Sequence, residues 1–111
     1  MKQGIIWSKD AGDESAEIIS YIKYNTGKIT AEKIYSKIIK EIKRISENPS
    51  AKRISPLLRD FGINYIHQFN INPWIIFYKI ENNRMEIISI IDGRRNFEEI
   101  LYTKMMDGKI T

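Results

Sequence analysis

The chain has 111 residues, 42% of them hydrophobic, a net charge of +4 and no cysteine. This length predicts one domain, residues 1–111, with enough apolar side chains for a single core. The lack of cysteine excludes disulfides, thiolate metal sites and a cysteine nucleophile. No apolar run approaches the roughly 18 residues of a membrane span, and the first run, Ile5–Trp7, is too short for a signal peptide. We therefore expect a soluble protein of the cytoplasm with no membrane partner.

The positive charge is concentrated in one segment of the chain. Residues 28–59 contain nine Lys or Arg and three Glu, a net charge of +6, whereas the segments before and after each carry a net charge of −1. Such an asymmetry favours an anionic partner, which can be a nucleic acid, an acidic protein, or both in turn. A solvated, lysine-rich helix has the same composition, so charge alone leaves these interpretations open.

A short strand and a first helix are predicted at the beginning of the chain. The apolar run Ile5–Trp7 suits a strand, and Ser8 suits the N-cap of a helix that begins at Lys9 or Asp13 and ends near Tyr24. Acidic residues in its first turn favour the positive end of the helix dipole. The buried face of this helix is expected to carry three isoleucines, Ile18, Ile19 and Ile22.

A second helix is predicted between Thr30, its expected N-cap, and the Asn48-Pro49 pair that ends it. Apolar side chains recur there at spacings of three and four, at Ala31, Ile34, Tyr35, Ile38, Ile42 and Ile45. Four cations form a basic stripe beside this apolar face, Lys33, Lys37, Lys40 and Arg44. With about five residues between them, the two helices should form an antiparallel hairpin.

From residue 63 onward the apolar pattern has the period of two that is typical of β-strands. One strand is predicted to place four side chains on one face, Ile63, Tyr65, His67 and Phe69. The next strand does the same with Trp74, Ile76, Tyr78 and Ile80, and a third runs from Met85 to Ile91. Asn72-Pro73 and Asn82-Asn83 supply the turns, so the three strands form an antiparallel meander.

The last predicted element is a short C-terminal helix with one apolar side, formed by Phe97, Ile100, Leu101 and Met105. The resulting order is strand, helix, helix, three strands and helix. This order separates helices from strands and predicts an α+β fold class. We expect an N-terminal strand, an antiparallel two-helix hairpin packed on a three- to four-stranded, mainly antiparallel sheet, and a short C-terminal helix.

Several short motifs follow one another along the chain: Trp7-Ser8, Ile18 to Ile22 with Tyr21, Glu47-Asn48-Pro49, Leu58-Arg59-Asp60, and Pro73-Trp74 with Ile76-Phe77-Tyr78. The most specific is Ile91-Asp92-Gly93-Arg94-Arg95-Asn96, a closing strand followed by a Gly-Arg-Arg turn. In these motifs the chain resembles the RelE/ParE toxin superfamily over nearly its whole length. The fold that this resemblance implies agrees with the fold that the periodicity predicts.

The resemblance implies a toxin of a bacterial type II toxin-antitoxin system. A cognate antitoxin is expected to silence it by wrapping a flexible C-terminal segment around it. Two activities are known under this fold: RelE-like toxins cleave messenger RNA in the ribosome, and ParE-like toxins poison DNA gyrase. A homodimer and a heterotetramer with the antitoxin are both compatible with this membership.

The resemblance favours the ParE-like branch, because most residues of the nuclease branch are missing. His67 and Gln68 lie on the middle strand, where the cleaving members carry lysines, and Leu101 lies near the position of their tyrosine. Ile75 stands where both branches commonly carry arginine. The favoured hypothesis is a gyrase-binding toxin without chemistry of its own. The alternatives are a RelE-type ribonuclease that acts on messenger RNA in the ribosome, and an inactive member that retains antitoxin binding.

The candidate site residues are one histidine and a set of cationic and apolar side chains. His67, the only histidine, is either a catalytic general base acting with Arg94 or Arg95, or a hydrogen-bonded structural residue. Arg94 and Arg95 lie in a loop that can present both guanidinium groups to phosphates or carboxylates. Further contacts to the target or the antitoxin are predicted at Arg53, Arg59, Phe97, Leu101 and Met105. We expect no metal and no cofactor, because one histidine without cysteine is a poor ligand set.

Overall fold

The structure is a computed structural model that describes residues 4–110, so the ends of the predicted domain, residues 1–3 and 111, lie outside the described residues. Its elements in chain order are β1 (Gly4–Trp7), α1 (Lys9–Thr26), α2 (Lys28–Ser46), the short 3₁₀ helix η1 (Pro49–Ala51), α3 (Pro56–Asp60), β2 (His67–Ile71), β3 (Trp74–Glu81), β4 (Arg84–Asp92) and α4 (Phe97–Met106). This order confirms the predicted α+β fold and adds two short helices between α2 and β2. None of the helices in the described part of the chain is both apolar enough and long enough to span a membrane.

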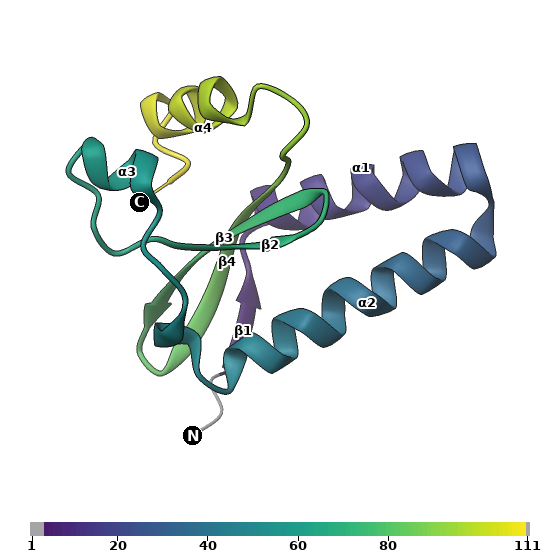
Figure 1. The fold of residues 1–111 in the computed structure, drawn as a ribbon, viewed down its shortest axis with the longest axis horizontal. Helices are drawn as coiled ribbons and strands as arrows, with labels where there is room; N and C mark the ends of the chain where they lie inside the picture. Colours follow the sequence, from purple (N-terminus) through teal and green to yellow (C-terminus); the bar gives the residue numbers. More distant parts are fainter. Residues whose placement is uncertain (1–3, 111) are drawn as a thin grey trace.

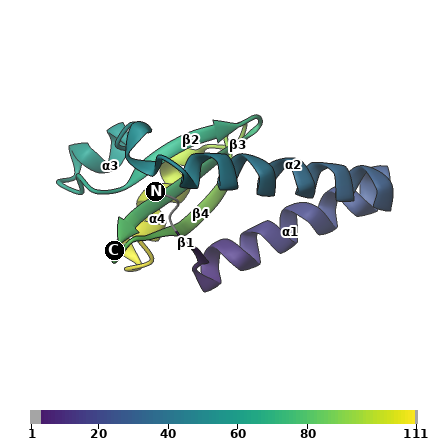
Figure 2. The same cartoon turned by 90° about the horizontal axis from the view of Figure 1, so that it is seen from below.

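The four strands form one sheet in the order β1-β4-β3-β2, in which β1 is parallel to β4 and the other neighbours are antiparallel. The turn between β3 and β4 forms as predicted, with Asn82 and Asn83 at φ values of 52° and 58°. Figures 1 and 2 show α1 and α2 as a hairpin on one face of the sheet, with α3 and α4 on the other side. The sheet is therefore the middle layer of three.

Strand β3 contributes to two cores, because its side chains alternate between the two faces of the sheet. Trp74, Ile76 and Tyr78 pack on the side of the helical hairpin. Ile75 and Phe77 pack on the opposite side, in the core that α3 and α4 cover. The period of two predicted the first of these faces, whereas the cover on the second face was not predicted.

A single residue, Gly27, joins α1 to α2 in place of the predicted linker of about five residues. Its φ of 97° is a conformation that favours glycine, and its N–H donates to the Lys23 carbonyl at 3.0 Å. Helix α2 already begins at Lys28, so the prediction that Thr30 is its N-cap is wrong. The N-cap of α1 is confirmed, since Ser8 Oγ accepts a hydrogen bond from the Ala11 N–H at 3.1 Å. The hairpin extends well past the sheet (Figure 1).

Strand β2 is shorter than predicted, because it begins at His67 rather than at Ile63. Helix α3 and the turn after it occupy residues 56–62, where the sequence predicted only a loop. The Ser55 N–H donates to the Ile66 carbonyl at 2.7 Å, which ties the segment before α3 to the segment that follows its turn. Residues 63–66 therefore return to the sheet edge in an irregular conformation.

Helix α1 completes the edge of β4 beyond the end of β1. The pairing of β1 with β4 ends at Trp7 and Ile87, and β4 continues past its partner strand. The Glu14 carboxylate accepts hydrogen bonds from Ser89 Oγ at 3.0 Å and from the Ile90 N–H at 3.1 Å. A side chain of α1 thus satisfies polar groups that a further strand residue would otherwise have to pair.

A buried lysine ties α4 to the same carboxylate. Lys104 Nζ donates to Glu14 Oε2 at 3.1 Å and also contacts the Asp10 carboxylate. Burial lowers the pKa of Lys104 to about 8, and burial raises the pKa of Glu14. Both groups therefore carry a desolvation cost, which their ion pair offsets. Helix α4 is held to α1 by this pair as well as to the second face of the sheet by apolar contacts.

Candidate partner-binding site

The predicted Gly-Arg-Arg turn opens onto a groove between α1 and one end of the sheet. Side chains from three separate parts of the chain line it: Glu17, Ile18, Tyr21, Ile22, Trp74, Asp92, Arg94 and Arg95. The strand register brings them together, because the first residue of β3 pairs with the last residue of β4 at this end of the sheet. We call this surface the arginine groove.

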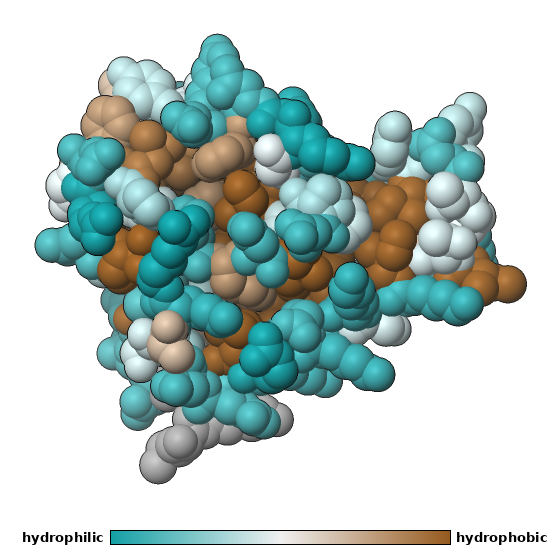
Figure 3. Space-filling model, in the orientation of Figure 1, coloured by the Kyte–Doolittle hydropathy of each residue, from teal (hydrophilic) through white to brown (hydrophobic). Residues whose placement is uncertain are grey.

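The floor of the arginine groove is apolar. Ile18 and Ile22 of α1 are half-buried, and Trp74 is buried between them and the sheet core. Tyr21, next to them on the helix, is 70% exposed. Figure 3 shows that, on the face viewed in Figure 1, apolar surface runs from the middle of the molecule onto the hairpin, with hydrophilic side chains around it. A partner segment with apolar side chains would find a complementary surface here.

Arg94 is held in place by the residue that ends β4. Its Nε donates to Asp92 Oδ1 at 3.0 Å and its Nη2 donates to Asp92 Oδ2 at 2.8 Å, while its backbone N–H donates to Oδ1 at 2.9 Å. The side-chain hydrogen bond from Arg94 lowers the pKa of Asp92. The Arg94 side chain is nevertheless 72% exposed. This bidentate contact orients a cation that still faces solvent, and the guanidinium groups are not buried in internal ion pairs.

Arg95 is the second cation of the arginine groove. It is exposed, and within residues 4–110 it makes no ion pair. Guanidinium groups bind planar anions such as carboxylates and phosphates through parallel hydrogen bonds. Arg95 can therefore receive an anionic group of a partner without first breaking an internal contact.

Gly93 allows the turn to lie close against the sheet. Its N–H donates to the Pro73 carbonyl at 2.8 Å. A Cβ at this position would lie 3.1 Å from the same carbonyl oxygen and 3.2 Å from Ile75 Cδ1. A side chain at this position would require the Pro73 carbonyl or the Ile75 side chain to move by a few tenths of an ångström, so glycine lets the turn with the two arginines lie this close to the start of β3.

His67 lies away from the arginine groove. It pairs with Tyr78 on β3, whereas the groove lies at the row of Ile71 and Trp74, four residues further along β2 and about 13 Å away. Its ring Nδ1–H donates to the Lys52 carbonyl at 2.7 Å, and the ring stacks on Tyr78 with centroids 5.1 Å apart. The structure thus gives His67 structural contacts and does not place it beside either candidate arginine.

A His67→Phe variant is expected to lose about 1 kcal/mol of unfolding free energy, because the Lys52 carbonyl loses its donor while the stacking on Tyr78 is kept. Growth arrest on expression should be unchanged. Urea denaturation and a growth assay check the two parts. Loss of arrest by a variant that stays folded would restore the catalytic hypothesis for His67.

The other predicted contact residues lie outside the arginine groove. Arg53 precedes β2, and Arg59 lies on α3, and both are exposed. Leu101 is fully buried in the core on the second sheet face, and Phe97 and Met105 are half-buried against it. The apolar side of α4 covers this face of the sheet, because the isoleucines there require cover from water. Leu101 is therefore not accessible to a partner, whereas contacts at Phe97 and Met105 stay a prediction.

Two parts of the groove were not predicted from the sequence. Trp74 was predicted as a core residue, and Tyr21 was noted only as part of a motif, yet both line the groove with Glu17. The signal that could have found them is the helical spacing of Glu17, Ile18, Tyr21 and Ile22, which gives one side of α1 a mixed polar and apolar character. Their meeting with the arginine turn depends on tertiary structure.

Comparison with known proteins decides the family. The chain matches the family model for the ParE toxin of the type II toxin-antitoxin system parDE over residues 5–97, a range that includes the whole arginine groove. The chain belongs to the ParE toxin family. A comparison of this ParE-family chain with curated proteins gives no significant match.

The fold of this ParE-family chain is also found in a solved structure. A chain described as the chromosomal ParDE TA system from P. aeruginosa matches it with a TM-score of 0.69 and 14% sequence identity. The match covers 82% of this chain and 96% of that chain. At this identity the likeness concerns the fold, and it agrees with the order of elements described above. The predicted membership of the RelE/ParE superfamily, with the ParE-like branch favoured, is confirmed.

Proposed function

We propose that this chain is a cytoplasmic toxin that acts by binding and poisoning DNA gyrase, and that a cognate antitoxin silences it by occupying the arginine groove. The observation that carries the proposal is the composition of the groove, which joins two exposed arginines to an apolar floor. Such a surface suits an acidic, amphipathic polypeptide segment. Either partner would be bound by the same side chains, so the antitoxin would exclude the target.

The groove is better suited to binding than to cleavage of RNA. Attack by a ribose hydroxyl needs a group that accepts its proton near neutral pH. Asp92 is a weak proton acceptor, because its hydrogen bond from Arg94 lowers its pKa. His67, the other candidate base, lies about 13 Å along the sheet by strand register. This arrangement supports a binding toxin over a RelE-type ribonuclease.

Ile75 bears on whether the chain is an active toxin. The resemblance places arginine commonly at this position, and its absence is one reason to consider an inactive member. The Ile75 side chain, however, is buried in the core under α3 and α4, on the sheet face opposite the hairpin. It therefore removes no cation from the arginine groove, so the composition of this groove gives no reason to favour the inactive member.

Expression of the chain without its antitoxin tests the proposal. We expect growth arrest with DNA damage signalling, and we expect purified protein to trap gyrase as a cleaved DNA complex while transcripts stay intact. Gyrase assays and sequencing of transcript ends measure the two outcomes. Cleaved transcripts would favour the ribosome-dependent ribonuclease, and normal growth with a retained antitoxin complex would favour the inactive member.

A further inference from the structure

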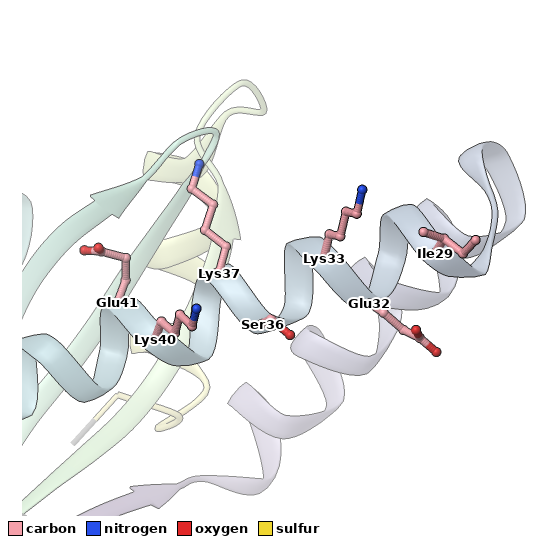
Figure 4. Close-up of a pocket in the computed structure, with 7 residues that line it drawn as sticks. All are labelled: Ile29, Glu32, Lys33, Ser36, Lys37, Lys40 and Glu41. Carbon is pink, nitrogen blue, oxygen red and sulfur yellow. The ribbon is translucent and has the colours of Figure 1, made fainter.

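A shallow, open depression lies on the outer side of the hairpin, between exposed side chains of α2. Seven residues of this one helix line it: Ile29, Glu32, Lys33, Ser36, Lys37, Lys40 and Glu41 (Figure 4). At 100° per residue, its lysines lie on average about 150° around the helix from the buried Ile38 and Ile42. The groove therefore faces away from the sheet, and it shares no residue with the arginine groove. We call it the outer groove.

The three lysines of the outer groove are free to bind a ligand. Lys33, Lys37 and Lys40 are all exposed, and no carboxylate in residues 4–110 forms an ion pair with any of them. The two glutamates of the groove are already paired with cations of the same helix. Glu32 lies 3.8 Å from Lys28 Nζ, and Glu41 lies 2.8 Å from Arg44 Nη2. None of the three lysines is thus in an ion pair within the described residues, although the charge of Lys37, after the hydrogen bond from Arg44, also helps to lower the pKa of Glu41.

The spacing of these lysines matches that of side chains on a second helix. Lys33, Lys37 and Lys40 follow the pattern i, i+4, i+7, with rises of about 6 Å and 4.5 Å along the axis. Figure 4 shows Lys33 and Lys37 projecting to the same side of α2. Carboxylates at the same spacing on a helix lying alongside α2 would meet all three ammonium groups.

An apolar anchor lies at one end of the outer groove. Ile29, one turn before Lys33, is 71% exposed, and Tyr24, just across Gly27 on α1, is 90% exposed. Tyr24 is in the last turn of α1 and Ile29 in the first turn of α2, at the end of the hairpin that extends past the sheet (Figure 1). Large exposed apolar side chains next to unpaired charges are typical of protein interfaces.

We propose that the outer groove is a docking surface for an acidic, amphipathic helix of the toxin's target protein; this rests on the proposed function, in which that target is gyrase. The apolar anchor favours a polypeptide over a nucleic acid backbone, because a phosphate backbone has no apolar side chain to contact Ile29 and Tyr24. We assign the target as the occupant because the two grooves share no lining residue, so an antitoxin bound at its proposed place in the arginine groove would leave the outer groove open. The target would then need both grooves, of which the antitoxin blocks one.

Charge reversal tests the proposal. The variant Lys33→Glu/Lys37→Glu reverses two lysines of the outer groove, and Lys23→Glu/Lys109→Glu makes the same charge change at two exposed lysines outside it. Glutamate and lysine have similar helix propensities, so both variants should fold, which urea denaturation checks. We expect the first variant to lose growth arrest and to bind gyrase at least about tenfold more weakly, while the cognate antitoxin still binds it. The control should behave as wild type.

Each other outcome has a defined meaning. Undiminished arrest by the first variant would overturn the outer groove as a target surface. Loss of antitoxin binding by that variant would assign the groove to the antitoxin instead and would equally overturn the proposal. A mobility shift of plain duplex DNA by wild type that charge reversal abolishes would assign the groove to nucleic acid. If wild type itself causes no arrest, the proposed function fails. If wild type and the first variant both cause arrest, the proposed function stands and only the outer-groove proposal fails.

Discussion

Replacing Lys104 with alanine is expected to lower the free energy of unfolding by about 3 kcal/mol and the thermal midpoint by about 15 °C. The ammonium group is buried between Asp10 and Glu14, and its removal leaves two carboxylates close together without their cation. The Glu14 carboxylate also caps β4, so the repulsion acts on the contact of α1 with the sheet. Urea denaturation at pH 7 measures the loss.

Two variants separate the ion pair from other effects of the Lys104 substitution. Lys109→Ala removes an exposed lysine from the same terminal segment and should change stability by less than about 0.5 kcal/mol. The double variant Glu14→Gln/Lys104→Met removes both charges of the pair and should recover part of the loss, because fewer unpaired charges remain buried. If Lys104→Ala is no less stable than Lys109→Ala, the ion pair does not hold α4 to α1.

The elements that the sequence predicted well are those whose signal lies within one stretch of chain. Helix α2 follows a local period of three and four, and β3 and β4 follow a period of two with a turn that Asn82-Asn83 marks. The segments predicted badly have an ambiguous local signal or depend on distant residues. The single-residue turn at Gly27 cannot be distinguished from a longer one by composition, and α3 has only one turn of local signal. The residues before His67 alternate between apolar and polar as in a strand, but they form an irregular segment after α3 and are not part of β2.

The candidate site was predicted in part for the same reason. Arg94 and Arg95 are adjacent in a recognisable turn, so local sequence was sufficient to propose them. Their groove also needs Tyr21 and Trp74, which only the tertiary structure brings to that turn. Alternation of apolar and polar residues predicted that His67 lies in a strand, but alternation does not say which residue of the next strand it pairs with. Its pairing with Tyr78 is what separates His67 from the arginines. The apolar stripe of α4 did not distinguish a face that binds a partner from a face that buries Leu101.

The double variant Arg94→Ala/Arg95→Ala is expected to abolish growth arrest while leaving the fold intact. Both side chains are exposed, and the contact of Arg94 with Asp92 is a surface ion pair, so the urea midpoint should stay close to that of wild type. The loss of function is expected because both groups that can bind anions at the arginine groove disappear. Growth after induction, with urea denaturation of the purified variant, checks both parts.

The matched control for this variant is Arg53→Ala/Arg59→Ala. It removes the same charge from two exposed arginines that lie outside the arginine groove, so it lowers the general attraction to anionic partners equally. We expect it to arrest growth as wild type does. Arrest lost in both double variants would mean that net charge, or the predicted direct contact of Arg53 and Arg59, matters as much as the arginine groove.

Titration of the purified toxin with its cognate antitoxin tests the central claim most directly, namely that partners bind in the arginine groove. Calorimetry should give an affinity for Arg94→Ala/Arg95→Ala at least about tenfold below that of wild type, and an unchanged affinity for Arg53→Ala/Arg59→Ala. Equal affinities for all three proteins would contradict the account, because the antitoxin would then bind a surface to which the Gly-Arg-Arg turn contributes nothing.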